Sequence, residues 1–123
     1  MDALENLDVW KRACRLSVST YQLLQSCNDF SFRDQIKRSA LSIPSNIAEG
    51  YERDSLKTCI QYLTIAKGSC GELWTQLLIG RKAGLIGSVL CRDLEKESKA
   101  ISKMLYGLIK HYKETQTQSK PSN

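Results

Sequence analysis

Apolar residues recur every three or four positions along most of this chain, and this spacing constrains the fold more than any other feature. In the longest run the two spacings alternate without a break, which is typical of the seam between packed α-helices. The sequence therefore predicts a helix that opens at Asp54 or Ser55 and ends at Gly84. Its apolar face comprises Leu56, Cys59, Leu63, Ala66, Cys70, Leu73, Leu77 and Gly80.

A first helix is predicted between about Leu4 and Cys27, and it carries two apolar lines rather than one. A single line suffices to face a core, so we expect the second to be covered by another subunit. The first line, expected to face the core, is Leu7, Trp10, Cys14, Ser17, Tyr21 and Leu24. The second line, predicted to form an oligomer interface, is Val9, Leu16 and Leu23.

A second helix is predicted from the N-cap residue Ser31 to about Gly50, and its periodicity continues through Pro44. Proline has no N–H for the carbonyl of Ala40, so the pattern predicts a helix kinked at Pro44. Ser45 or Asn46 is expected to rearrange the hydrogen bonds there. The apolar face of this helix is Phe32, Ile36, Ala40, Ile43, Ile47 and Tyr51.

A fourth helix is predicted from Ser88 to about Lys113. Its apolar face is Leu90, Leu94, Ile101, Leu105, Leu108 and Tyr112. Four long amphipathic helices with short connections predict an all-α fold, an up-down-up-down antiparallel four-helix bundle over residues 1–114. Residues 115–123 are polar and are predicted to be disordered. Gly68 and Gly71 lie off the apolar seam, where we expect close approach of another backbone.

Several classes of protein have little support in the sequence. No run of about 18 apolar residues is long enough to span a membrane, and the acidic N-terminus is unlike a signal peptide, so we expect a cytoplasmic protein. The five cysteines form no CxxC pair and are expected to be reduced, without a metal. The chain has a single histidine, no P-loop and no Glu-x-x-His motif, which predicts no catalysis and no cofactor.

The basic excess lies in the second half of the chain. The net charge is +5; residues 1–57 balance eight basic against eight acidic side chains, and residues 58–123 carry ten against five. One helical face of the fourth segment, within about 60° of one line, carries Arg92, Lys96, Lys99, Lys103, Lys110 and Lys113, with Tyr106 among them.

Two interpretations of this basic face stay open. The cations are spaced to follow a phosphate backbone, and Tyr106 is placed to stack on an unpaired base. Alternatively, the lysines form a solvated surface offset by Asp93, Glu95 and Glu97, and Tyr106 is buried in an oligomer interface. Glu97 itself projects toward the apolar side and is expected to pair with a basic residue.

Two smaller basic clusters are secondary candidates for nucleic-acid contact. The first helix carries Lys11, Arg12 and Arg15, and the second carries Arg33, Lys37 and Arg38. For each cluster alone, a solvated surface is the favoured interpretation, although repetition in an oligomer would multiply weak phosphate contacts.

Three stretches resemble a known family: LDVWKRA at residues 7–13, SIPSNIAEG at 42–50 and AKGSCGEL at 66–73. They are similar to a bacterial four-helix-bundle family whose members include proteins encoded in intervening sequences of 23S rRNA genes. The resemblance covers nearly the whole chain and implies a left-handed bundle that assembles into a ring-like homopentamer. The family is related to accessory variability proteins of diversity-generating retroelements, basic pentamers that bind nucleic acid and reverse transcriptase.

The resemblance makes SIPSNIAEG a family feature rather than a catalytic motif. Two interpretations of it stay open: its polar residues tie the kink to the third helix, or Asn46, Glu49 and Arg53 line a ligand or protein site. The residues of this motif and its expected partners are Pro44, Asn46, Glu49, Gly50, Gly68, Ser69 and Glu72. We expect a non-enzymatic homo-oligomer that binds RNA or DNA, with a protein assembly or adaptor module as the alternative.

Overall fold

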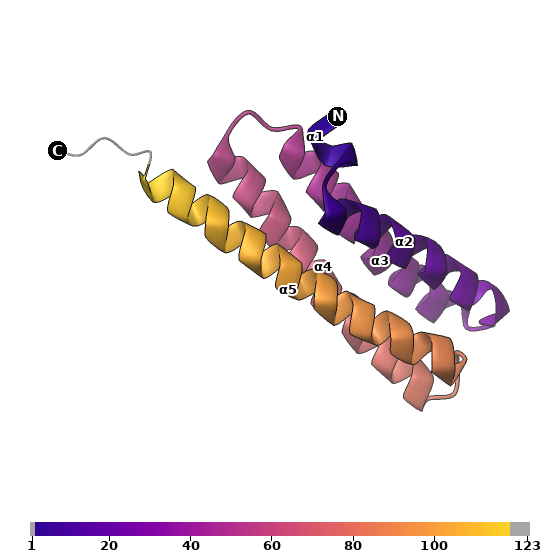
Figure 1. Ribbon diagram of the computed structural model, residues 1–123. Coiled ribbons are helices and arrows are strands. Elements are labelled where there is room, and N and C mark those ends of the chain that lie inside the picture. The colour runs from indigo at the N-terminus through magenta and orange to yellow at the C-terminus, as the bar shows by residue number, and fades with distance from the viewer. Residues whose placement is uncertain (1, 119–123) are drawn as a thin grey trace.

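The computed structural model describes residues 2–118, which are almost entirely helical and contain no strand. Four long helices dominate, and consecutive ones are joined by short connections (Figure 1). The elements are α1 (Asp2–Glu5), α2 (Asp8–Leu23), the 3₁₀ turn η1 (Leu24–Ser26), α3 (Phe30–Tyr51), α4 (Leu56–Lys82) and α5 (Ser88–Gln118). The all-helical prediction is therefore confirmed.

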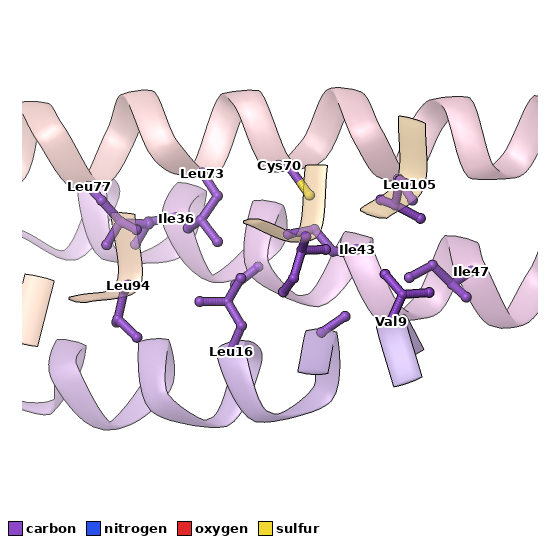
Figure 2. Packing of buried hydrophobic residues seen from close by; sticks show 14 of the residues in the cluster. Val9, Leu16, Ile36, Ile43, Ile47, Cys70, Leu73, Leu77, Leu94 and Leu105 are labelled. Atoms are coloured by element: carbon purple, nitrogen blue, oxygen red, sulfur yellow. The ribbon is translucent and has the colours of Figure 1, made fainter. Parts of the chain in front are cut away.

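The long helices pack around one hydrophobic core. Each packs against the next along the chain, and α2 also packs against α5. Figure 2 shows the centre of this core, where Leu16 of α2, Ile43 of α3 and Leu73 of α4 point toward one another. All three are at most 2% exposed. The chain therefore buries a continuous apolar interior without a second copy.

The first predicted helix is divided, and the prediction of its two faces is correct only in part. The chain turns at residues 6 and 7 between α1 and α2, and η1 ends the segment. The core-facing side of α2 includes Val9, Leu16 and Leu23, which are 3%, 2% and 8% exposed. These three side chains are packed inside their own chain, so they do not form the oligomer interface predicted for them. In the line predicted to face the core, Ser17 and Leu24 are buried, and Leu7 and Trp10 pack against the core. Cys14 of the same line is half-buried, and Tyr21 is 38% exposed.

Pro44 lies inside α3, and α2 compensates for the hydrogen bond that it removes. Ser17 Oγ donates to the carbonyl oxygen of Ala40 at 2.6 Å, and both groups are buried. This carbonyl lies four residues before the proline and therefore has no helical N–H donor. Ser17 takes the compensating role that the sequence suggested for Ser45 or Asn46. The bend itself at Pro44 stays a prediction.

Side chains and glycine define the ends of the helices. Asp29, rather than the predicted Ser31, caps α3 by accepting from the Phe32 N–H, while Ser55 caps α4 as expected. Gly84, with φ of +74°, ends α4: its N–H bonds Arg81 O, and the Leu85 N–H bonds Gly80 O. This pair of bonds is the Schellman arrangement, which requires a left-handed residue at that position.

Close approach explains Gly50 and Gly80, but not Gly68 and Gly71. A Cβ at Gly50 would lie 3.2 Å from both Cys59 O and Tyr62 Cβ. Gly50 thus lets α3 approach α4, and the helix continues one residue past it to Tyr51. A Cβ at Gly68 or Gly71 would meet nothing within 4 Å, so the close approach predicted there is wrong within the chain.

Helix α5 begins at Ser88 as predicted, but one residue of its apolar face and its C-terminal end differ from the prediction. Leu90 is 42% exposed, and Cys91 occupies the core position instead. The helix continues to Gln118, so residues 115–118 of the predicted polar tail are helical. The rest of that tail, residues 119–123, lies outside the described residues.

Candidate nucleic-acid interface

The predicted basic face of α5 is exposed along its whole length. Arg92 and every lysine of the face are exposed, and Tyr106 retains 59% of its accessible surface. Among residues 2–118, no ion pair involves any cation of this face. We call the set Arg92, Lys96, Lys99, Lys103, Lys110 and Lys113 the α5 basic face.

Helix α4 turns this face into one wall of a groove, because the two helices lie side by side (Figure 1). The α4–α5 groove consists of three hollows along their outer seam. The largest, of about 560 Å³, lies near the C-terminal end of α5 and has Ile109 in its wall. It is lined by Thr64, Lys67, Tyr106, Ile109, Lys110, Lys113, Glu114, Thr117 and Gln118.

The other two hollows share Trp74 and Lys99. One, of about 350 Å³, joins these residues to Arg92 and Lys96, and the other, of about 200 Å³, to small side chains of both helices. The Lys99 ammonium lies 4.5 Å from the centroid of the Trp74 ring. Such a cation–π contact contributes about 0.5–1 kcal/mol at an exposed site.

Two of the three nearby acids are already paired. Arg81 Nε and Nη2 donate to Glu95 at 2.7 and 3.1 Å, and this hydrogen bonding lowers the pKa of Glu95. Arg12 Nη2 and Nε donate to Glu97 at 2.5 and 2.9 Å, as expected for a glutamate that faces inward. These carboxylates neutralise arginines of α4 and α2. They therefore reduce the positive potential of the α5 basic face less than their positions in the sequence suggest.

The two secondary clusters are less available to a partner. In the first, Arg12 is half-buried against Glu97, so only Lys11 and Arg15 remain exposed. In the second, the Arg33 guanidinium lies 4.6 Å from the Phe30 ring centroid. The Lys37 ammonium lies 5.1 Å from the Tyr21 ring, and Arg38 is exposed beside a hollow between α3 and α4.

The polar residues around Pro44 link α3 to α4. Asn46 Nδ2 donates to Ser42 O at 2.9 Å and to Ser42 Oγ at 2.8 Å, and Ser42 Oγ lies 2.8 Å from Ser69 Oγ. Glu49 forms an ion pair with Arg53, whose Nη2 also donates to Tyr62 Oη at 3.1 Å. Glu72 lines the α3–α4 hollow, whereas Gly68 is exposed.

The thiols show no sign of reactivity. Cys27, Cys59, Cys70 and Cys91 are buried and Cys14 is half-buried, and none of the five is in a disulfide. Burial raises the pKa of Cys70 and of Cys91 to about 12, so neither is a thiolate near pH 7. Within residues 2–118, no group of three His, Cys, Asp or Glu side chains could hold a metal ion. No described helix is long and apolar enough to cross a membrane.

The aromatic and cationic side chains that α4 contributes to the groove, Trp74, Lys67 and Arg81, were not predicted from the sequence. Each lies off the apolar face of α4, and its relation to α5 depends on how the two helices are rotated against each other. Their mutual spacing of seven residues along α4 could have indicated that they share a helix face.

Comparison with known proteins identifies a family and a similar solved structure. A family model described as 23S rRNA-intervening sequence protein matches residues 5–107. No curated protein matches the chain. A crystal structure from Bacteroides thetaiotaomicron VPI-5482, described as a protein with unknown function from the S23 ribosomal protein family, superposes with a TM-score of 0.74. The two sequences are 26% identical over 83% of this chain and 98% of that one.

Proposed function

The chain belongs to the family of 23S rRNA-intervening sequence proteins, and from this premise we propose that it is a non-enzymatic homo-oligomer that binds nucleic acid through the α5 basic face. The observation that carries the proposal is the run of exposed, unpaired cations on α5, beside an exposed tyrosine and a half-buried tryptophan. Phosphates that replace condensed counterions on such a face favour binding through counterion release.

The proposal includes the arrangement of the subunit and of the assembly. Short connections between helices that pack against their neighbours support an up-down-up-down antiparallel four-helix bundle. Exposed apolar side chains on α2 and α3, Val18 at 57% and Leu41 at 51%, support self-association on the outside of this helix pair. A homopentamer is the assembly that the resemblance implies, and repetition of the basic face around a ring would multiply its weak contacts.

The test is fluorescence anisotropy with labelled structured RNA and duplex DNA across a salt series. The variant K96Q/K99Q/K103Q removes three neighbouring cations of the α5 basic face. A matched variant, K11Q/K57Q/K82Q, removes three exposed lysines outside the α5 basic face and lowers the net charge by the same amount; of the three, only Lys11 belongs to a secondary cluster. We expect the first variant to bind more weakly than the second. The slope of log K against log salt should fall by about 2–3 for duplex DNA.

Two results would overturn this function. Equal loss in both triple variants would mean that overall charge, not the α5 basic face, governs the interaction. Absence of binding even at low salt would leave the charge as an aid to solubility. In that case the exposed apolar side chains on α2 and α3 favour the second candidate, a protein assembly or adaptor module whose interface responds little to salt.

A further inference from the structure

We infer that the α4–α5 groove takes a single strand of nucleic acid, with Trp74 as the platform on which an unpaired base stacks. This inference rests on the proposed function and specifies the form of its ligand. It comes from the position of Trp74, an aromatic residue of α4 that the structure brings against the cations of α5.

Trp74 is open to a ligand from both of the hollows that it lines. On one side the hollow contains Arg92 and Lys96, which are exposed and placed to contact phosphates. Glu95 also lines this hollow, but its carboxylate is paired with Arg81. On the other side the lining side chains are small or absent, so the surroundings of the indole stay open to a flat group. The residues of that second hollow, besides Trp74 and Lys99, are Cys70, Gly71, Ser98 and Ser102.

Lys99 lies over the indole in the free protein, and its positive charge suits the same ligand, because a nucleic acid carries phosphates. Its ammonium lies over the Trp74 ring, and the side chain is exposed. A base that stacks on the ring displaces this ammonium, which is then free to pair with the phosphate of the same nucleotide. The contact that is lost is an exposed cation–π pair, which is weaker than the stacking of a base on an aromatic ring.

Tyr106 provides a second aromatic surface farther along the same groove. It lies seven residues after Lys99 on α5, which corresponds to roughly 10 Å along the helix axis. Lys103 is exposed on α5 between the two aromatic positions, and Lys110 and Lys113 line the hollow around Tyr106. The groove thus alternates rings with cations, which is the pattern that holds unpaired bases and their backbone together.

A duplex would gain less from this arrangement. Its bases are already stacked and paired, so it can offer phosphates to the lysines but no free base to Trp74 or Tyr106. We therefore expect an unpaired strand to bind more tightly than a duplex at the same salt concentration. Single-stranded RNA and DNA share the base and phosphate chemistry that the groove recognises, and separate titrations with each would rank them.

The fluorescence of Trp74 can report binding once the other of the two tryptophans in the chain, Trp10, has been replaced. Trp10→Phe leaves Trp74 as the single tryptophan of the full-length protein, and excitation selective for tryptophan avoids emission from the five tyrosines. Titration of this variant with twelve-nucleotide oligo(U) and oligo(dT), and with a duplex of twelve base pairs, follows Trp74 emission. We expect a single strand to quench the emission in a saturable manner, and the duplex to quench it less and to bind more weakly.

Substitutions of Trp74 separate stacking from charge. In the protein that retains Trp10, Trp74→Leu should weaken binding of the labelled single strand about tenfold, whereas Trp74→Phe, which keeps a ring, should retain most of the affinity. Circular dichroism of both variants checks that the helices are intact. Equal loss in the two variants would overturn the inference.

The outcomes distinguish the inference from the function on which it rests. Binding that leaves Trp74 emission unchanged and is unaffected by Trp74→Leu would overturn the single-strand inference and leave the function of the α5 basic face intact. A duplex that binds as tightly as the single strand would likewise overturn the single-strand inference and leave the function of the α5 basic face intact. No binding of any nucleic acid at low salt would overturn both.

Discussion

The hydroxyl of Ser17 donates a hydrogen bond to the carbonyl of Ala40, the acceptor that Pro44 deprives of its helical donor. The proline therefore requires a donor from outside its own helix, and α2 provides one. This bond holds two consecutive helices in register, because Ser17 Oγ reaches Ala40 only when α2 and α3 pack as they do. Pro44 thus acts through the packing of α2 as well as through the shape of α3.

Ser17→Ala should lower the free energy of unfolding by about 1–3 kcal/mol, because it leaves the buried Ala40 carbonyl unpaired. In a Pro44→Ala background the cost should be at least about 1 kcal/mol smaller, since the alanine that replaces the proline has an N–H to donate to the same carbonyl. Urea denaturation of the four proteins in this double-mutant cycle measures the coupling. Ser45→Ala, at an exposed serine of α3, is the control and should change little. Additive effects of the two substitutions would contradict the assignment.

The Glu95–Arg81 pair should make stability depend on acid pH. Hydrogen bonding to Arg81 holds the folded-state pKa of Glu95 below its ordinary value of about 4.3, so the unfolded state binds the proton more readily. The stabilisation is complete above pH 4.3 and is lost as the pH falls through the folded-state pKa. Glu95→Gln should therefore be less stable than wild type at pH 7, and the difference should narrow below about pH 4. Urea denaturation from pH 3 to 7 tests this, and a constant difference would contradict it.

The helices could be predicted because apolar spacing of three and four leaves few alternatives, and the N-cap Ser55 marks the start of α4. The buried side of α2 could be predicted only in part. Ser17 lies in the line expected to face the core and is buried, where it donates to Ala40 O. Thr20, which was in neither predicted line, is also buried and donates to Leu16 O. Hydrophobicity alone cannot anticipate polar groups that are satisfied by a neighbouring helix or by their own backbone. Spacing also does not say which of two apolar lines faces the core, so the buried Val9, Leu16 and Leu23 were assigned to an oligomer interface.

The same distinction applies to the candidate site. The α5 basic face could be predicted because all its members lie on one helix, where spacing fixes their relative directions. Trp74 could not be added to it from sequence, because its contact with Lys99 depends on the rotation of α4 against α5. Glu97 could be predicted in part. Helix geometry indicates that it points inward, but its partner, Arg12 of α2, can be identified only from the packing of the helices.

Replacement by alanine should change the stability of the protein in opposite directions at two glycines of α4. A Cβ at Gly80 would lie 2.6 Å from Phe32 Cζ and 2.9 Å from Ile86 Cδ1, so Gly80→Ala should be destabilising by about 1–2 kcal/mol despite the better helix propensity of alanine. A Cβ at Gly68 would meet no atom of another segment of residues 2–118 within 4 Å, so Gly68→Ala should be stabilising by up to about 1 kcal/mol. Denaturant midpoints of the two variants test the contrast. Similar shifts in both would mean that local packing does not explain these glycines.

Leu41→Glu should weaken self-association, because Leu41 is exposed on α3 and follows directly after Ala40, at the contact between α2 and α3. Burial of a leucine in a subunit interface stabilises it by about 1.5–3 kcal/mol, and a buried unpaired glutamate would add a further cost. Multi-angle light scattering gives the mass, which for a pentamer of this 13.9 kDa chain would be about 70 kDa. Ser31→Glu, at an exposed position in the first turn of α3, adds the same charge and should leave the mass unchanged. A monomeric wild type would contradict the proposed assembly, whereas an oligomer that Leu41→Glu leaves intact would place its interface elsewhere on the surface.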